Sequence, residues 1–379
     1  MSKTNIGHVI VHELIKENNK DFDYSKPYHL RESELDKENQ TVNKLVEDVI
    51  ELYGSRGNSA HYGVFKSEKN ERGPIPDEFH KYFSLSKSNS DNFISLSKLI
   101  MKQMFHSAKG QPWASGGYIV FTDYISQGVR FLLVTMIKKK DGVRISQNLE
   151  PEEMIHLDLS NINQAAKINF HLYDKYLNAN ELEKTELSFL SFVSKNTGQS
   201  AAAYFISALG CDKGIASAGA TRKLPKEVRN FFKKQPDLKI FAESFKKEVV
   251  KYLDLKLQNK ESAKLSDIEA LALTHLNHLD ESTRNNHITE LMRYLNSENI
   301  RIPTEFVVNK ATLEKIKNVI YKDKLMSFNF DKELLGVTND ARVFFDELNS
   351  SLCFNKLPEE ALSKIRAAIK EKQQEKTDG

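Results

Sequence analysis

The sequence predicts an α+β protein: an N-terminal antiparallel or mixed sheet with helices, a helical basic middle and a small C-terminal sheet. Three observations carry this prediction. Short β-branched runs alternate with helical patterns up to about residue 178, helical patterns follow one another up to 306, and short alternating runs return from 307. A chain of 379 residues exceeds what one core usually serves. We therefore expect domains at 1–178, 179–306 and 307–379.

The N-terminal part contains the clearest strand patterns. Residues 6–15 form a short β-branched run, and two very apolar runs at 116–124 and 129–140 flank a turn-like "ISQG", which predicts a buried hairpin. Helical spacing predicts helices at 41–54 and 91–105. Further strands are expected at 141–146, 154–160 and 164–173.

From residue 179 onward the pattern becomes helical. Helices are expected at 182–195, 200–210, 226–234, 237–256, 265–279 and 281–299. Residues 311–321 fit a helix or a strand equally well. Alternating runs at 325–331, 341–347 and 351–356 predict the small terminal sheet, and a closing helix is expected from Pro358.

Composition indicates an ordinary soluble protein, with 40% apolar and 28% charged residues. The longest apolar stretch, Val129–Ile137, is too short to cross a bilayer, and the N-terminus lacks the pattern of a signal peptide. Cys211 and Cys353 are far apart, so we expect no disulfide framework and a reducing cytoplasm. No cofactor, metal or membrane partner is predicted.

Positive charge is concentrated in residues 222–256. This stretch holds eleven Lys or Arg residues against five carboxylates, a net charge of +6, whereas the whole chain carries +3. Like charges this close repel one another, and a polyanion relieves that repulsion. Lysines also cover ordinary solvated helix faces, so charge alone does not decide between these two explanations.

Helical spacing orders this charge. On one helix Leu224, Val228 and Phe232 share a side, and on the next Phe241, Phe245 and Val249 do. Cations lie across from both, and Asp237 is placed to cap the second helix. The expected phosphate contacts, with little base specificity, are Arg222, Lys223, Lys226, Arg229, Lys233, Lys234, Lys239, Lys246, Lys247 and Lys251.

Three patterns offer weaker evidence for chemistry. "GIASAGAT" at 214–221 nearly matches a phosphate-binding loop, but Ala220 stands where its Lys belongs. His8 and His12 would share one face of a strand about 13 Å apart, too far for one metal ion. The carboxylates of a metal-dependent nuclease, with Lys167, could come from Glu150, Glu152, Glu153 and Asp158, although acidic turn residues are common. Cys211 is expected to be a buried structural thiol.

Several segments together resemble one family, the bacterial nucleoid-associated proteins of the YejK/NdpA type. The likeness rests on the order and spacing of "VIVHELIKE", "YGVF", "GGYIVFTDY", "FLLVTMIKKKDGVRISQNLE", "IHLDLSNINQAAKINFHLY", "LSFLSFVSKNTGQSAAAYFISALGC", "LMSFNFDKELLG" and "ARVFFDELNSSLCFN". The resemblance implies a protein of the cytoplasmic nucleoid that binds double-stranded DNA and has no assigned catalytic activity. It supplies no contact residues.

Other functions remain open from the sequence. The basic face could dock an acidic protein partner, in an adaptor that belongs to a phage-defence or mobile-element system. Residues from 295 onward match the family pattern only loosely, which is compatible with such a specialised member. A homodimer would supply two surfaces for bridging DNA, but no sequence feature requires it.

Overall fold

The protein is described by a computed structural model that covers residues 4–16, 24–54, 60–84, 89–109, 111, 114, 116–160, 164–194, 205–212 and 217–375. The chain forms two compact units, Met1–Asn309 and Lys310–Gly379. The α+β class is confirmed. Within the described residues, no helix combines the length and the apolar character that a bilayer span requires.

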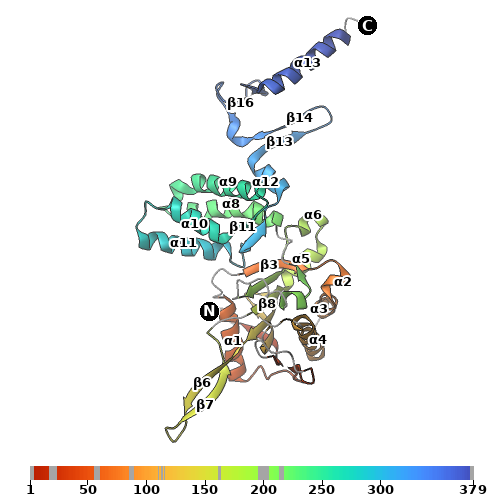
Figure 1. The fold of residues 1–379 in the computed structure, drawn as a ribbon, viewed down its shortest axis with the longest axis vertical. Helices are drawn as coiled ribbons and strands as arrows, with labels where there is room; N and C mark the ends of the chain where they lie inside the picture. Colours follow the sequence, from red (N-terminus) through yellow and green to blue (C-terminus); the bar gives the residue numbers. More distant parts are fainter. Residues whose placement is uncertain are drawn as a thin grey trace. The chain divides into compact units, whose positions relative to one another are not determined.

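An eight-stranded sheet organises the first unit (Figure 1). Its order is β10-β3-β9-β8-β5-β4-β1-β2, and every neighbouring pair is antiparallel. The strands are β1 (Asn5–Leu14), β2 (Tyr28–His29), β3 (Ala60–Phe65), β4 (Gly117–Ser126), β5 (Val129–Ile137), β8 (Gln164–Asn169), β9 (Leu190–Ser194) and β10 (Cys211–Asp212). The buried hairpin expected around residue 127 is confirmed as β4–β5.

Helices cover both faces of this sheet. On one face α3 (Ile75–Ser84), α4 (Ser90–Ala108) and α5 (Phe170–Asn178) pack onto it through residues such as Phe79, Phe93 and Tyr173. On the other face α1 (Gln40–Gly54) contributes Val49 and Tyr53 to a second, smaller core. The strands are apolar on both sides because both sides are covered.

A two-stranded ribbon leaves the sheet between β5 and β8. It consists of β6 (Lys139–Ile145) and β7 (Pro151–Leu157), and it extends away from the rest of its unit (Figure 1). Short helices α2 (Lys69–Arg72) and α6 (Glu181–Lys184) lie in connections.

Four helices form a bundle within the first unit. They are α8 (Ser217–Lys234), α9 (Ala242–Gln258), α10 (Leu265–His275) and α11 (Glu281–Leu295), with a 3₁₀ turn at Lys239–Phe241 before α9. Strands β11 (Ser262–Lys264) and β12 (Glu305–Val307) pair beside them.

The side chain of Asn296 connects this bundle to the sheet. It is 2% exposed; its Oδ1 accepts from the backbone N–H of Ala60 at 3.0 Å, and its Nδ2 donates to the carbonyls of Ala60 and Ile302 at 2.9 and 2.7 Å. Asn296 thus takes the place of a neighbouring strand at the beginning of β3. The Tyr62 hydroxyl adds a bond to the carbonyl of Asn296.

A buried ion-pair group lies at the same junction. Lys167 of β8 and Arg301, each 7% exposed, both contact Glu298 at 3.1 and 3.0 Å. The Lys167 ammonium lies over the rings of Tyr53 and Phe131. Buried charges persist when they are paired and hydrogen-bonded in this way.

Three local predictions are wrong. Residues 170–173 were expected to continue a strand, but α5 begins at Phe170 because Asn169 caps it by accepting from the N–H of Leu172 at 3.0 Å. Residues 190–194 were expected to be helical but form β9. Asp237 does not cap α9; it accepts from His287 at 2.6 Å.

Parts of the helix expected at 200–210 lie outside the described residues. The three-domain division stays a prediction; β9 and β10, beyond residue 178, belong to the large sheet.

The second unit contains short elements. The stretch 311–321, which fits either structure, is divided between α12 (Lys310–Lys317) and β13 (Asn318–Lys322). Strand β13 pairs with β14 (Ser327–Asp331), and a second small sheet contains β15 (Leu335–Gly336), β16 (Val343–Asp346) and β17 (Ser351–Phe354). A 3₁₀ turn at Lys332–Leu334 precedes β15, and α13 (Glu359–Glu375) closes the unit.

The two N-terminal histidines face α4, as expected for one face of a strand. His8 stacks on Phe93 and bonds to Glu34, whereas His12 is 1% exposed and bonds through Nε2 to the Ser97 hydroxyl at 2.9 Å. The backbone N–H of Arg31 donates to His12 Nδ1 at 3.1 Å, which makes His12 a neutral tautomer that donates through Nε2. Burial, together with the positive charge of the nearby Lys98, lowers the pKa of His12 to about 4.

We predict that Asn296→Ala lowers the free energy of unfolding by about 3 kcal/mol, because it leaves the buried N–H of Ala60 and carbonyl of Ile302 without this partner. Urea denaturation measures this change. Asn286→Ala, at an exposed position of α11, the helix that ends just before Asn296, serves as the control and should change stability by less than about 0.5 kcal/mol. Equal effects of the two variants would contradict the assigned role.

We predict a pH dependence of stability that originates in His12. Its pKa lies below the unfolded value of 6.5, so unfolding takes up a proton and stability falls as the pH drops from 6.5 toward 4. The loss should reach about 2 kcal/mol at pH 5. Unfolding by urea at pH 7.5 and pH 5 measures it. His12→Gln should remove this part of the difference, and an unchanged difference in that variant would rule out His12 as its source.

Candidate nucleic-acid interface

Helices α8 and α9 form an antiparallel pair whose apolar sides face inward. Leu224, Val228, Phe245 and Val249 are each fully buried, as expected, and the ring of Phe232 stacks on that of Phe245 with centroids 4.7 Å apart. Helix α8 begins at Ser217, earlier than expected, and includes Pro225. This packing fixes the direction in which both helices present their cations.

Six cations lie on the outer side of this pair and are called the basic face here: Lys226, Arg229, Lys233, Lys246, Lys247 and Lys251. Glu243 lies among them. It contacts Arg229 at 2.5 Å and Lys233 at 3.5 Å, and it interacts electrostatically with Lys246. The bond from Arg229 lowers the pKa of Glu243. Two helices therefore contribute to a single positively charged surface.

The other carboxylates of residues 222–256 bond to different groups. The Tyr294 hydroxyl donates to Glu227 at 2.7 Å, His287 bonds to Asp237, and His275 lies 3.1 Å from Glu248. The Gln258 amide donates to Asp254 at 3.1 Å. Glu227, Asp237 and Glu248 therefore bond to neutral or weakly basic side chains, and not to the cations of the basic face.

The remaining predicted contacts are placed elsewhere. Arg222 pairs with Glu186 at 2.5 Å, and Lys234 lies over the ring of Tyr294, on the side of α8 that packs toward α11. Lys223 is half-buried and donates to the carbonyl of Ile300; burial lowers its pKa, and Arg301 and Arg222 lower it further. Lys239 is exposed at the turn between the two helices.

In the segment that nearly matches a phosphate-binding loop, the described hydroxyl groups bond to other parts of the fold. Residues 214–216 lie outside the described part of the chain. The Ser217 hydroxyl donates to the carbonyl of Val307, and the Thr221 hydroxyl donates to Ser217 and accepts from the N–H of Asn309. Both hydroxyls therefore serve the fold.

The residues weighed for a nuclease do not come together. Glu152 pairs with Arg144 within the exposed ribbon at 2.8 Å, and Glu153 points to the opposite face of β7. Lys167 is buried at the junction with Glu298. Among the described residues, no group of three or more His, Cys, Asp or Glu side chains is arranged to hold a metal ion. Cys211 is buried, as predicted, and Cys353 is exposed; both are free thiols.

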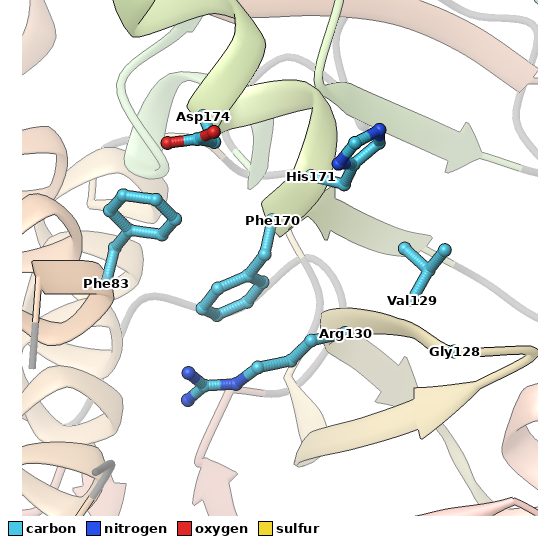
Figure 2. A pocket seen from close by; sticks show the side chains of 7 residues that line it. All are labelled: Phe83, Gly128, Val129, Arg130, Phe170, His171 and Asp174. Carbon is cyan, nitrogen blue, oxygen red and sulfur yellow. The ribbon is translucent and has the colours of Figure 1, made fainter. Parts of the chain in front are cut away.

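A cleft of about 470 Å³ opens beside the β4–β5 hairpin (Figure 2). Figure 2 shows Phe83, Arg130, Phe170, His171 and Asp174 around it. The Arg130 guanidinium lies 4.3 Å from the Phe170 ring and binds Asp123, which also accepts from Tyr82 at 2.5 Å. Burial raises the pKa of Tyr82, and Asp123 raises it further. Its cation is already paired, and the rest of the cleft combines the rings of Phe83 and Phe170 with the polar side chains of His171 and Asp174.

Sequence reasoning missed this buried group and also the role of Glu243. An Asp within the apolar run "YIVFTDY" was a signal, because a carboxylate in a buried strand needs a cationic or hydroxyl partner. No comparable signal identified Glu186 or Tyr294, since their contacts join segments far apart in the chain.

Comparisons with known proteins give a consistent result. Residues 10–361 match the family described as "Nucleoid-associated protein YejK". A protein of Pseudomonas savastanoi pv. phaseolicola named "Nucleoid-associated protein" is 22% identical over 361 residues, covering 95% of this chain and 99% of that protein. One from Azotobacter vinelandii with the same name is 23% identical, with coverages of 95% and 98%. "Nucleoid-associated protein YejK" of Shigella flexneri is 21% identical, with coverages of 93% and 94%.

The family match covers most of the first unit, the second unit as far as residue 361, and the whole of the basic face. This chain therefore belongs to the YejK family of nucleoid-associated proteins.

Proposed function

We propose that the protein binds double-stranded DNA in the bacterial nucleoid through the phosphate backbone, with little sequence preference and without catalysis. The single observation that carries the proposal is the basic face, in which Glu243 of α9 pairs with Arg229 and Lys233 of α8 and so brings cations of the two helices onto one surface. The names of the relatives, which place them with the nucleoid, support the same function.

The fold brings like charges from two helices close together. Neighbouring ammonium groups on α8 and α9 repel one another, and that repulsion costs stability in the free protein. Phosphates replace it with attraction and release condensed counterions from the duplex, which makes the affinity strongly dependent on salt. The carboxylate of Glu243 competes with phosphates for Arg229 and Lys233.

The composition of the face favours backbone binding over base reading. Five of its six cations are lysines, whose ammonium groups act as point charges on flexible stems. Base readout relies instead on bidentate side chains held in a groove. In this proposal Lys239 adds to the face at the turn, whereas Arg222, Lys223 and Lys234 contribute less because each has an internal partner.

We expect Lys226→Ala, Lys233→Ala and Lys247→Ala, combined in one variant, to weaken binding to a random-sequence duplex roughly tenfold or more at low salt. The slope of log affinity against log salt should fall by about 0.9 for each lost phosphate contact. Fluorescence anisotropy over a salt series measures both quantities.

The matched control replaces the exposed Lys44, Lys102 and Lys175 of helices α1, α4 and α5 by Ala, with the same change in net charge. Its affinity and slope should stay near those of the unmodified protein. Equal losses in both triple variants would mean that net charge, not the basic face, determines binding. If an acidic polypeptide binds and the duplex does not, the face docks a protein.

A change in the opposite direction is expected for Glu243→Gln. This variant removes the carboxylate that pairs with Arg229 and Lys233 in the basic face, so affinity for the duplex should rise a few-fold and the salt slope should become steeper. Glu281→Gln, at the exposed beginning of α11, is the control and should bind like the unmodified protein. Weaker binding by Glu243→Gln would show that Glu243 is needed to position the cations.

A further inference from the structure

The turn between α8 and α9 exposes a large apolar side chain. Ile240 is 81% exposed, more than either of the other exposed large apolar residues of the four-helix bundle, Leu255 and Leu273, at 54% and 38%. Single exposed apolar side chains are common on protein surfaces and need no explanation by themselves. The position of Ile240 in the turn and beside the basic face therefore decides what it can do.

The bundle holds this turn on both sides of Ile240. The backbone N–H of Phe241 donates to the carbonyl of Leu238 at 2.9 Å, which closes the 3₁₀ turn. The side chain of Leu238 is fully buried, and the ring of Phe241 packs against that of His278 with centroids 4.4 Å apart. Ile240 therefore projects into solvent from a backbone that is anchored immediately before and after it.

Ile240 lies on the same side of the chain as the basic face. The 3₁₀ turn continues directly into α9, and Glu243, Lys247 and Lys251 follow Ile240 by three, seven and eleven residues. Residues at these spacings form one stripe along a helix. Glu243 also pairs with Arg229 and Lys233 of α8. The exposed isoleucine thus stands at the end of the surface that carries the cations of both helices.

An apolar side chain at this place gains nothing from phosphates, but it gains when it is buried between bases. Proteins that bend DNA insert Ile, Leu, Phe or Met between neighbouring base pairs, while nearby cations bind the phosphates on either side. Here Lys239, exposed and adjacent in sequence, and Lys247 on the same stripe can supply such phosphate contacts.

We infer that Ile240 inserts between two base pairs of the bound duplex and kinks it, so that the protein bends DNA. This inference rests on the proposed function and adds to it a distortion of the duplex. It requires no base-specific hydrogen bond, because a wedge acts on stacking. Pyrimidine–purine steps, which unstack most easily, should be the preferred positions of the kink.

The first test compares the unmodified protein with Ile240→Ala on a random-sequence duplex of about 20 base pairs that carries a donor and an acceptor fluorophore at its ends. The unmodified protein should raise the energy transfer, as expected for a kink of roughly 20–90°, and Ile240→Ala at saturating concentration should not. Fluorescence anisotropy of the same duplex measures affinity. The slope of log affinity against log salt should be the same for both proteins, because no phosphate contact is lost.

Two variants serve as controls. Leu182→Ala, at a position of α6 that is 77% exposed and outside the basic face, removes a similar apolar side chain and should bend the duplex like the unmodified protein. Ile240→Leu keeps an apolar wedge and should retain most of the bending. Far-UV circular dichroism checks that all variants are folded.

The second test uses a duplex that is already unstacked at one place by a two-nucleotide bulge. The unmodified protein should bind it roughly fivefold more tightly than the fully paired duplex, because the energy of unstacking is no longer required. Ile240→Ala should bind the two duplexes with equal affinity, since it inserts no wedge.

The outcomes separate this inference from the proposed function. Binding of the duplex without a change in energy transfer would overturn the inference and leave the proposed function in place, whereas no binding of any duplex would overturn both. Bending that persists in Ile240→Ala, or that is lost equally in Leu182→Ala, would remove the role assigned to Ile240. A preference for the bulged duplex that Ile240→Ala retains would do the same.

Discussion

The arrangement of the first unit depends on one constraint, which is that polar groups buried at the junction between sheet and helical bundle need partners there. Asn296 satisfies the N–H of Ala60, where no strand does, and Glu298 joins Lys167 of the sheet to Arg301 of the connection after α11. Polar groups that are buried are costly in any other geometry, so a junction of this kind specifies one orientation. The direction of α8 and α9, and hence of their cations, follows from it.

The choice of bonding partners also determines where positive charge remains in residues 222–256. Five carboxylates occur among its eleven cations, yet the fold directs Glu227 to a tyrosine and Asp237 and Glu248 to histidines. Aromatic rings also determine where the cations lie. The stacked rings of Phe232 and Phe245 hold the two helices together, and the Lys234 ammonium lies over the ring of Tyr294. Positive charge is concentrated by the placement of acids as much as by the number of lysines.

Much of the fold could be predicted from local patterns. The apolar hairpin of β4 and β5 and the inward sides of α8 and α9 follow from periodicity, because a covered face leaves a regular trace in the sequence. Strand β9 could not be identified in this way. It lies between β3 and β8, with Phe189, Leu190, Phe192 and Val193 all buried, and a strand covered on both sides loses its alternation.

The candidate site, too, could be predicted only in part from local patterns. Helical spacing correctly placed Arg229 and Lys233 across from the apolar residues of α8. Spacing within one helix could not show that Lys234 is drawn to Tyr294 or that Lys223 is half-buried near Ile300. These outcomes depend on a side chain and a backbone carbonyl more than 50 residues away, and only the assembled bundle brings them close.

The ribbon of β6 and β7 has a consequence for how the family varies. The ribbon departs from strands β5 and β8. These two strands pair directly with each other, from Phe131 opposite Asn169 to Met136 opposite Gln164, so the sheet is continuous without the ribbon. The ribbon's own pairing ends near Ile145 and Pro151. Residues 146–150 can therefore lengthen, shorten or be cut by a protease while the sheet stays intact, which makes this tip a natural place for divergence among members and for the insertion of a tag.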